Sequence, residues 1–266
     1  MAHVSGAGPS PTDLVGVVLA AGAGTRLAPL SRLRPKALCP VGDRALVDHA
    51  LARVVPHVVE VAVNVHHGRL LVEAHLTRAG AAVRPHLSVE PEQARGTAGA
   101  LGLLRPWIAG RGVLLTNADA WLPADLTPLV EGWDGERVRL LCVEDPERGD
   151  FGSRRYCGAA LLPWRLVAAL GEQPSGLYEV MWRAEAEAGR LDLVTHTGTF
   201  VDCGTVADYL AANLDASGGG SVVGEGARLG EGCEVVRSVV WSDAEVARGE
   251  RLVDAIRAGT LTVLVR

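Results

Sequence analysis

Lysine is almost absent from this chain of 266 residues. Of the 26 lysine and arginine residues, only Lys36 is a lysine. The lysine ammonium is a compact point charge that can sit against one phosphate oxygen, whereas the arginine guanidinium is a larger planar fork. Codon bias would explain the shortage of lysine, but it leaves open why this one remains. Lys36 is therefore the first candidate for a functional group.

Cysteine is also scarce, and none of the five is arranged in a CxxC pair. Their odd number and scattered spacing argue against a disulfide framework or a structural zinc site. They fit a reducing compartment, so we expect a cytoplasmic protein. These cysteines are Cys39, Cys142, Cys157, Cys203 and Cys233.

No apolar run is long enough to cross a bilayer. The N-terminal segment Met1 to Thr12 lacks the basic start and apolar core of a signal peptide. We therefore expect no membrane partner. The net charge of −5 gives no bulk attraction to nucleic acid, so we expect no nucleic-acid partner either. An anionic ligand must be bound by a local site.

Apolar runs of strand length alternate with helical patterns from Leu14 to Leu214, which predicts an α/β domain with a mostly parallel, covered sheet. We assign this domain to residues 1–216. The predicted strands are Leu14–Ala20, Val58–Val65, Val83–Val89, Val113–Thr116 and Arg137–Val143. The predicted helices are 46–54, His67–Ala79, Thr97–Ile108, Leu177–Ala188 and Val206–Leu214.

Residues 217–266 follow a different pattern. Ser217 to Gly220 has the composition of a flexible linker. Beyond it, aliphatic residues recur every six positions with one slip, which predicts a parallel β-helix of about two coils rather than an irregular tail. So few coils must lean on the main domain or on a partner subunit. We expect glycines at the corners and six side chains pointing into a narrow core: Val223, Leu229, Val235, Val240, Val246 and Leu252.

The first predicted strand runs into the segment Leu19 to Leu27, which contains Ala20, Ala21, Gly22, Gly24 and Thr25. Small residues directly after a strand let backbone N–H groups approach a phosphate chain. The segment is neither a P-loop, since no GKS or GKT follows, nor a dinucleotide fingerprint, since the third glycine is missing. A plain tight turn would not explain why Arg26 and Lys36 flank it.

These segments resemble the nucleotidyltransferase family of sugar-1-phosphate pyrophosphorylases. Leu19 to Leu30 is similar to that family's LAAGxGTRLxPLT-like loop, and Arg34 to Val41 to its RPKxLxPV-like segment. The similarity continues nearly to the end of the chain, and the nearest branches look like mannose-1-phosphate guanylyltransferases and N-acetylmuramate-1-phosphate uridylyltransferases. The resemblance implies a Rossmann-like domain, a left-handed hexapeptide-repeat β-helix and, because relatives with such tails often associate, a homo-oligomer.

The resemblance also implies a role for each matching position. Arg26, Lys36 and Asp119 would be catalytic, and Asp119 and Asp202 would hold Mg²⁺. A nucleoside triphosphate would be bound by Leu19, Ala20, Ala21, Gly22, Gly24, Thr25, Arg26, Gln93, Gly96 and Thr97. A sugar 1-phosphate would be bound by Asn64, Gly152, Gly158 and Glu179.

Elementary chemistry agrees with these roles. A sugar phosphate is already an anionic oxygen nucleophile, so the obstacle is bringing it onto an anionic triphosphate. Positioning and charge neutralisation should therefore dominate. Magnesium prefers carboxylate and phosphate oxygens. Either aspartate alone would be explained as a turn-forming residue, but their joint placement relative to the loop favours metal binding.

The sequence indicates the identities of the sugar and of the nucleotide base less clearly than the type of reaction. Relatives that act on hexose 1-phosphates often carry a second lysine between the positions of Gly152 and Gly158, where this chain has Arg154 and Arg155. These arginines either replace that lysine or are solvated loop charges. The segment Glu90 to Gly99 looks more like the guanylyl branch, which favours GTP with a mannose-1-phosphate-like sugar. The alternatives are a uridylyl- or thymidylyltransferase and a non-catalytic member of the same fold.

Overall fold

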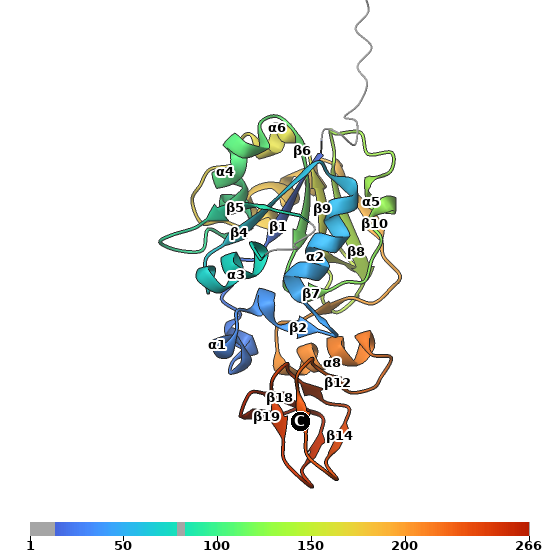
Figure 1. The fold of residues 1–266 in the computed structure, drawn as a ribbon. Coiled ribbons are helices and arrows are strands. Elements are labelled where there is room, and N and C mark those ends of the chain that lie inside the picture. Colours follow the sequence, from blue (N-terminus) through green and yellow to red (C-terminus); the bar gives the residue numbers. More distant parts are fainter. Residues whose placement is uncertain (1–13, 79–82, 266) are drawn as a thin grey trace, which may run out of the picture. The chain divides into compact units, whose positions relative to one another are not determined.

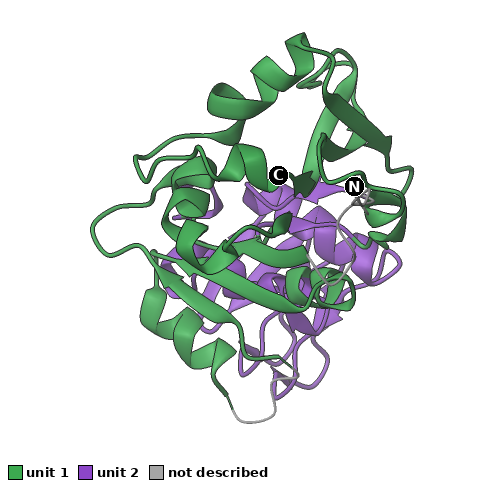
Figure 2. Ribbon diagram, turned by 90° about the horizontal axis from the view of Figure 1, so that it is seen from above, with its two compact units in different colours: residues 1–22, 50–118, 123–198 green, residues 23–49, 119–122, 199–266 purple. Residues whose placement is uncertain are grey.

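The computed structural model describes residues 14–78 and 83–265, so the expectations for Met1 to Thr12 and for Ala79 lie outside the described residues. The chain divides into two compact units, coloured separately in Figure 2. Unit 1 comprises residues 1–22, 50–118 and 123–198, and unit 2 comprises residues 23–49, 119–122 and 199–266. A division at residue 216 stays a prediction. None of the described helices is long and apolar enough to cross a membrane.

Unit 1 is built on a seven-stranded sheet in the order β10-β8-β9-β6-β1-β4-β5 (Figure 1). All neighbouring strands are parallel except β9, which runs antiparallel to both β6 and β8. The predicted α/β class with a mostly parallel sheet is confirmed. The strands are β1 (Leu14–Leu19), β4 (Glu60–Val65), β5 (His86–Val89), β6 (Gly112–Asn117), β8 (Val138–Glu144), β9 (Arg154–Leu162) and β10 (Leu191–Thr195).

Helices cover the sheet of unit 1 because its central strands are apolar on both faces. On one face, Val15 and Val17 of β1 share a core with Leu101 and Leu104 of α4. On the other face, Gly16 has no side chain, and an added Cβ would collide with Val54. The helices of unit 1 are α3 (Arg69–Leu76), α4 (Gly96–Ile108), α5 (Thr127–Val130), α6 (Trp164–Val167), the π-helical turn Tyr178–Trp182 and α7 (Arg183–Glu187); α2 (Leu46–Val54) begins in unit 2 and ends in unit 1.

Two strands of this sheet are absent from the prediction. β9 contains Arg154, Arg155 and Gly158, which break the apolar pattern of a buried strand, yet it lies in the middle of the sheet. β10 alternates aliphatic and polar residues at the sheet edge, next to β8. The remaining predicted elements of unit 1 are present with shifted ends, such as a strand beginning at His86 instead of Val83.

Unit 2 combines short elements from three separate parts of the sequence. Its strands pair β2 with β3 and β7 with β11, both antiparallel. These elements are α1 (Leu30–Leu33), β2 (Pro40–Val41), β3 (Arg44–Ala45), β7 (Ala120–Trp121), β11 (Val201–Asp202) and α8 (Val206–Ala216), with single 3-10 turns at Thr25–Leu27 and Lys36–Leu38.

The C-terminal part of unit 2 forms two parallel coils, as the six-residue period predicts. Three short ladders stack the first coil on the second, through β12 and β15, β13 and β16, and β14 and β17. β18 continues the first ladder and turns back antiparallel into β19. The strands are β12 (Val222–Val223), β13 (Arg228–Leu229), β14 (Glu234–Val236), β15 (Val239–Val240), β16 (Glu245–Val246), β17 (Arg251–Val253), β18 (Ala255–Ala258) and β19 (Leu261–Leu264).

Burial in these coils differs from the expectation of one enclosed aliphatic core. Val240, Val246 and Leu252 of the second coil are buried as predicted. The expectation of burial is wrong for Val223 and Leu229, which are 45% and 47% exposed. They pair in register with Val240 and Val246, but the first coil ends the stack. Among the described residues, no further strand pairs with β12 or β13 on the outer side.

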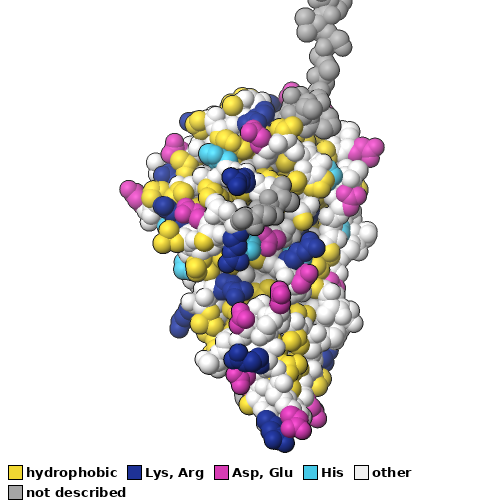
Figure 3. Space-filling view, in the orientation of Figure 1, with side chains coloured by type: hydrophobic (Ala, Val, Ile, Leu, Met, Phe, Trp, Pro, Cys, Tyr) yellow, Lys and Arg dark blue, Asp and Glu magenta, His cyan; other side chains and the backbone are white. Residues whose placement is uncertain are grey.

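Glycines form the corners of the coils, as predicted. A Cβ on Gly224 would lie 2.5 Å from the backbone nitrogen of Ser242, and Gly226 and Gly232 have positive φ angles of 75° and 71°. Opposite charges also align between the coils, and basic and acidic side chains lie together on this part of the surface (Figure 3). Each pair is 17 residues apart, which is one coil: Arg228 with Glu245, Glu231 with Arg248, Glu234 with Arg251, and Arg237 with Asp254.

The coils lean on the rest of unit 2. Val239, Trp241 and Ile256 share a buried core with Leu30 and Cys39. The Trp241 ring also lies 4.8 Å from the guanidinium carbon of Arg34. So short a tail is expected to need support from the main part of the chain. The segment that carries Lys36 packs against it and provides this support.

Candidate active site

In unit 2, Lys36 lies between two aspartates. Its Nζ is 3.1 Å from Asp119 Oδ2 and 3.5 Å from Asp202 Oδ1. The Lys36 side chain is 6% exposed, whereas those of Asp119 and Asp202 are partly open to solvent. Three charged groups that are far apart in the sequence therefore meet at one point.

Strand pairing explains why the two aspartates meet. β7 and β11 run antiparallel, and Asp202 lies opposite Ala120, the residue after Asp119. The backbone N–H of Cys203 donates to the carbonyl of Asp119 at 3.2 Å. Both carboxylates are thus fixed by backbone geometry at the end of one small ladder.

The position of Lys36 depends on Gly24. Gly24 adopts φ 60°, and a Cβ there would lie 2.9 Å from Lys36 Cβ. Gly24 also accepts a hydrogen bond from the backbone N–H of Leu27, which starts the 3-10 turn Thr25–Leu27. Only glycine adopts such a backbone at low cost and leaves this space. The glycine-rich loop therefore packs directly on the lysine stem.

Arg26 completes this charged group. Its Nη2 lies 3.8 Å from Asp202 Oδ2, and its side chain is 71% exposed. Gly204 leaves room for it, since a Cβ there would lie 3.0 Å from the same Nη2. An exposed guanidinium held at one end is free to turn toward an anion.

The cysteines nearest this group are poor nucleophiles. Burial raises the pKa of the Cys39 and Cys203 thiols to about 12. The thiolate is the nucleophilic form of cysteine, so neither is reactive at neutral pH. The charged side chains are therefore the candidates for chemistry at this site.

The two aspartates fit a magnesium ion. They offer hard carboxylate oxygens, converge on one cationic group and are open enough to meet a phosphate. Within residues 14–78 and 83–265, no group of three or more His, Cys, Asp and Glu side chains could hold a metal. The remaining ligands of an ion at Asp119 and Asp202 would come from substrate and water.

In unit 1, the residues Leu19 to Gly22 leave β1 at its carboxyl end. The Ala20 N–H donates to Asn64 Oδ1 at 2.7 Å, and Leu19 O accepts from the N–H of Ala118 at 2.9 Å. Gly22 is exposed, and a Cβ there would meet nothing within 4 Å. The start of this loop is therefore held tightly while its glycine faces open space.

A row of glycines holds the start of α4 in unit 1. Cβ atoms on Gly96 and Gly99 would each lie 2.5 Å from a backbone oxygen, of Ser175 and Gln173 respectively. Gly102, three residues on, would collide with the carbonyl of Gly171. Thr97 Oγ1 accepts from the N–H of Leu177 at 2.8 Å. The start of α4 is thus held by the segment 171–177. Gln93 is exposed in the loop before α4.

The predicted sugar-side residues are spread over unit 1. Gly152 lies in the tight turn before β9, and Gly158 lies within β9; both have positive φ angles, of 66° and 94°. Glu179 is exposed on the π-helical turn, with its carboxylate against Gly176. Asn64 differs from these, because it is 3% exposed and its amide is engaged at both ends.

The two arginines of β9 are paired with acidic residues. Arg154 Nη1 lies 3.0 Å from Glu144 Oε2, and Arg155 Nη1 lies 3.3 Å from Asp145 Oδ2. A phosphate would have to compete with these carboxylates. This pairing argues against the replacement of a lysine, and since both arginines lie on β9 and are paired, they are not solvated loop charges either.

Two buried residues of unit 1 are missing from the predicted set. Glu90 accepts from Asn64 Nδ2 and from the Arg95 N–H, both at 2.7 Å. Arg53 Nη2 donates to Thr116 Oγ1 at 2.9 Å, at the end of β6, and burial lowers the Arg53 pKa to about 10. Asn64 and Thr116 lie on the strands β4 and β6, distant in sequence from Glu90 and Arg53, so no local spacing in the sequence reveals these residues.

Comparison with known proteins identifies the relatives of this chain. Residues 15–152 match the family described as nucleotidyl transferase. The chain is 41% identical over 237 residues to an N-acetylmuramate α-1-phosphate uridylyltransferase of Caulobacter vibrioides, covering 76% of this chain and 97% of the relative. It is 26% identical over 218 residues to the enzyme of the same name from Neisseria meningitidis, covering 71% and 93%.

A solved structure shares the fold. It is a Bacillus anthracis protein assigned as a glucose-1-phosphate thymidylyltransferase, crystallised with sucrose. The TM-score is 0.66 at 19% identity, covering 76% of this chain and 95% of that one. At this identity the likeness concerns the fold alone.

Proposed function

The chain belongs to the nucleotidyl transferase family, and from that premise we propose that it transfers the uridylyl group of UTP to N-acetylmuramate 1-phosphate, with release of pyrophosphate. The observation that carries the proposal is the 41% identity along 97% of the Caulobacter relative. It supports the uridylyl alternative better than the sequence-based preference for GTP and mannose 1-phosphate.

The reaction is a substitution at the α-phosphorus of UTP. An oxygen of the sugar phosphate forms the new bond to this phosphorus, and the bond to the oxygen bridging to the β-phosphate breaks. The leaving group is pyrophosphate, and no proton has to be removed from the nucleophile. The protein therefore has to gather anions and hold them in line.

Lys36 and Arg26 supply the positive charge for this task. Lys36 is a buried ammonium with a fixed position. It is suited to oxygens of both the α-phosphate and the attacking sugar phosphate. A preorganised charge of this kind needs no rearrangement as charge shifts in the transition state. Arg26 is exposed and is suited to the β- and γ-phosphates.

Asp119 and Asp202 would hold Mg²⁺. When bound, the ion supplies charge neutralisation on phosphate oxygens. Without it, the two carboxylates lie beside the Lys36 ammonium and the Arg26 guanidinium and offset the positive charge that would attract a triphosphate. Their place beside Lys36 supports a metal role over a purely structural ion pair.

The residues of unit 1 provide the nucleotide and sugar contacts in this proposal. The backbone of Leu19 to Gly22 would follow the nucleotide, and Gln93, Gly96 and Thr97 would face the base. Gly152, Gly158 and Glu179 would face the sugar. The exposure of Gly22, Gln93 and Glu179 supports these contacts.

Two further parts of the proposal concern the oligomeric state and the cellular location of the protein. We expect a cytoplasmic homo-oligomer in which the first coil meets a second copy. The half-exposed Val223 and Leu229 and the unpaired outer edge of that coil support this, because open strand edges are normally covered. Light scattering before and after truncation at Ala216 tests it, and a wild-type monomer would contradict it.

A substrate matrix tests the proposed reaction. UTP, dTTP, GTP and CTP are each combined with N-acetylmuramate 1-phosphate, N-acetylglucosamine 1-phosphate, glucose 1-phosphate and mannose 1-phosphate, and pyrophosphate release is measured. The highest kcat/KM is expected for UTP with N-acetylmuramate 1-phosphate. Faster turnover of another pair would replace this substrate assignment, and no turnover of any pair would contradict the proposed activity.

A further inference from the structure

Asn64 and Glu90 form a buried chain of hydrogen bonds inside unit 1. The Ala20 N–H donates to Asn64 Oδ1, Asn64 Nδ2 donates to Glu90 Oε1, and the Arg95 N–H donates to Glu90 Oε2. Each of the three bonds is 2.7 Å long. We call this the Asn64–Glu90 relay.

Backbone donors fix the direction of the relay. The N–H of Ala20 can only donate, so the oxygen of the Asn64 amide must face it and the NH₂ must face Glu90. The N–H of Arg95 likewise requires an acceptor. Both oxygens of Glu90 therefore accept, which is the pattern of an ionised carboxylate.

Burial makes the relay costly to break. Asn64 is 3% exposed and Glu90 is 1% exposed. Among the described residues no ion pair reaches Glu90, so hydrogen-bond donors alone compensate for burying its charge. Its backbone is held as well, because the Glu90 N–H donates to Val65 O at 2.9 Å and Glu90 O lies 2.6 Å from His66 Nδ1.

The two ends of the relay lie where the proposed nucleotide contacts begin. Ala20 is the first residue after β1. Arg95 directly precedes Gly96, the first residue of α4. Asn64 lies on β4, which pairs with β1 on one side and with β5 on the other, so the relay crosses the sheet from one loop to the next.

We propose that Asn64 and Glu90 are positioning residues that hold the phosphate-facing loop and the base-facing loop of unit 1 at a fixed separation for the nucleotide. In this proposal Asn64 positions the two loops instead of contacting the sugar, since it is 3% exposed and each end of its amide already makes a hydrogen bond. The inference rests on the proposed nucleotide-binding role of the two loops.

Exchanging the amide and the carboxylate tests the relay. In Asn64→Asp, two carboxylate oxygens face each other in the middle of the relay. In Glu90→Gln, an amide oxygen can accept at only one end. In the double variant Asn64→Asp/Glu90→Gln, the new carboxylate at position 64 would accept from the Ala20 N–H and from the new amide at position 90. The oxygen of that amide would accept from the Arg95 N–H. The double variant restores three hydrogen bonds and the same charge.

Ser88→Ala is the control variant. Ser88 is a buried polar residue on β5 that takes no part in the relay.

Two measurements are made on these four variants and the wild type. The first is the KM for UTP, together with kcat. Losing a buried hydrogen bond to a charged group is expected to raise KM about tenfold in each single variant. The KM of the double variant should return to within about threefold of the wild-type value. The KM of Ser88→Ala should also lie within about threefold of the wild-type value.

The second measurement is hydrogen exchange, read by mass spectrometry on peptides covering residues 19–22 and 94–97. Both peptides should exchange faster in each single variant and be protected again in the double variant. This readout does not require turnover. If the wild type fails to use UTP, the proposed function is wrong, and hydrogen exchange still decides whether the relay couples the two loops.

Three results would overturn the inference. Single variants that lower only the melting temperature, with unchanged KM, would make the relay purely structural. A double variant as impaired as the singles would show that the bonding pattern is not what matters. Faster exchange at only one of the two peptides would show that the loops are not linked.

Discussion

Lys36 Nζ lies 3.1 Å from Asp119 Oδ2, although the two residues are 83 positions apart in the sequence. The lysine side chain is 6% exposed, while the aspartate faces solvent over about half of its surface. The ammonium is thus fixed in place beside a carboxylate that is free to meet a metal ion or substrate. This pair is the centre of the proposed chemistry.

Replacing Lys36 should stop turnover more than it weakens binding. Lys36→Ala is expected to lower kcat by roughly 10²-fold or more, the scale of losing one preorganised charge. Lys36→Arg should rescue little, because a planar guanidinium is larger and cannot occupy the same point beside Gly24. Steady-state kinetics of both variants, with circular dichroism to check folding, measures this. Near-wild-type turnover in Lys36→Ala would remove the residue from the mechanism.

The two aspartates should act together through magnesium. Asp119→Asn and Asp202→Asn are each expected to remove most activity while leaving the fold intact, and EDTA should do the same to the wild type. Titrating Mg²⁺ back should restore the wild type at lower concentration than either variant. Full activity in EDTA, or unfolding of either Asn variant, would point to a structural ion pair instead.

The glycine row of α4 should be sensitive to a single methyl group. Gly99→Ala gains about 1 kcal/mol of helix propensity. It also places a Cβ about 2.5 Å from the carbonyl of Gln173, and such overpacking costs typically 1–3 kcal/mol. A lower melting temperature is therefore expected. Gly171→Ala is the matched control, since its Cβ would meet nothing within 4 Å. Equal melting temperatures for both variants would contradict this packing.

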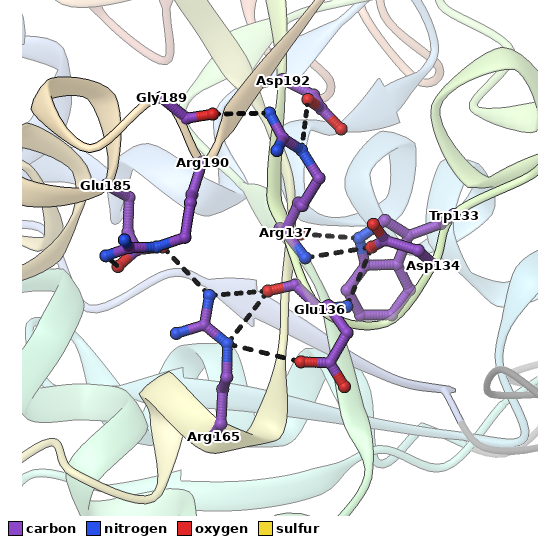
Figure 4. Close-up of polar contacts among 9 residues, drawn as sticks. All are labelled: Trp133, Asp134, Glu136, Arg137, Arg165, Glu185, Gly189, Arg190 and Asp192. Atoms are coloured by element: carbon purple, nitrogen blue, oxygen red, sulfur yellow. Dashed lines mark hydrogen bonds and ion pairs between the residues drawn. The ribbon is translucent and has the colours of Figure 1, made fainter. Parts of the chain in front are cut away.

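A buried carboxylate on α7 should make unit 1 sensitive to acid. Glu185 is held by Arg190 through two hydrogen bonds of 2.8 and 3.0 Å and by Arg165 at 3.0 Å (Figure 4). The hydrogen bonds from Arg190, together with Arg165, lower the pKa of Glu185 below its ordinary value. The stabilisation is then present above the ordinary glutamate pKa, near 4.3, and is lost as the pH falls through the lowered value.

Glu185→Gln tests this pH dependence. The variant loses charge-assisted hydrogen bonds to two arginines that are themselves 39% and 50% exposed. This costs about 2 kcal/mol, so the variant should unfold at a lower denaturant concentration than the wild type at pH 7. The difference in unfolding free energy should shrink as the pH is lowered below 4. Chemical denaturation across pH 3–8 measures it. A difference that stays constant over this range would show that the charge of Glu185 does not stabilise unit 1.

Local patterns in the sequence predict much of this structure. Runs rich in aliphatic residues identify β1, β4 and β6, and the six-residue period identifies the two coils of the tail. The shortage of lysine and the motif around Lys36 single out this residue, and the structure brings it together with Asp119 and Asp202. The strand and coil predictions are confirmed because each depends on spacing within one segment, whereas the role of Lys36 stays a prediction.

Other features depend on contacts that local patterns do not encode. β9 lies inside the sheet despite Arg154 and Arg155, because both find acidic partners at its start. Glu90 is buried only because Asn64 and Arg95 supply donors from other elements. Leu229 follows the same period as Val246 but stays half-exposed, because it belongs to the first coil, which lies at the end of the stack.

The most direct test of the central claim follows the α-phosphorus of UTP. The protein is incubated with Mg²⁺, N-acetylmuramate 1-phosphate and UTP labelled with ³²P at either the α- or the γ-position, and the products are separated. The proposed reaction places the α-label in a nucleotide-sugar and the γ-label in pyrophosphate, and the Lys36→Ala variant loses both. Label from the γ-position in orthophosphate or on the sugar, or no label transferred from the α-position, would contradict nucleotidyl transfer by this chain.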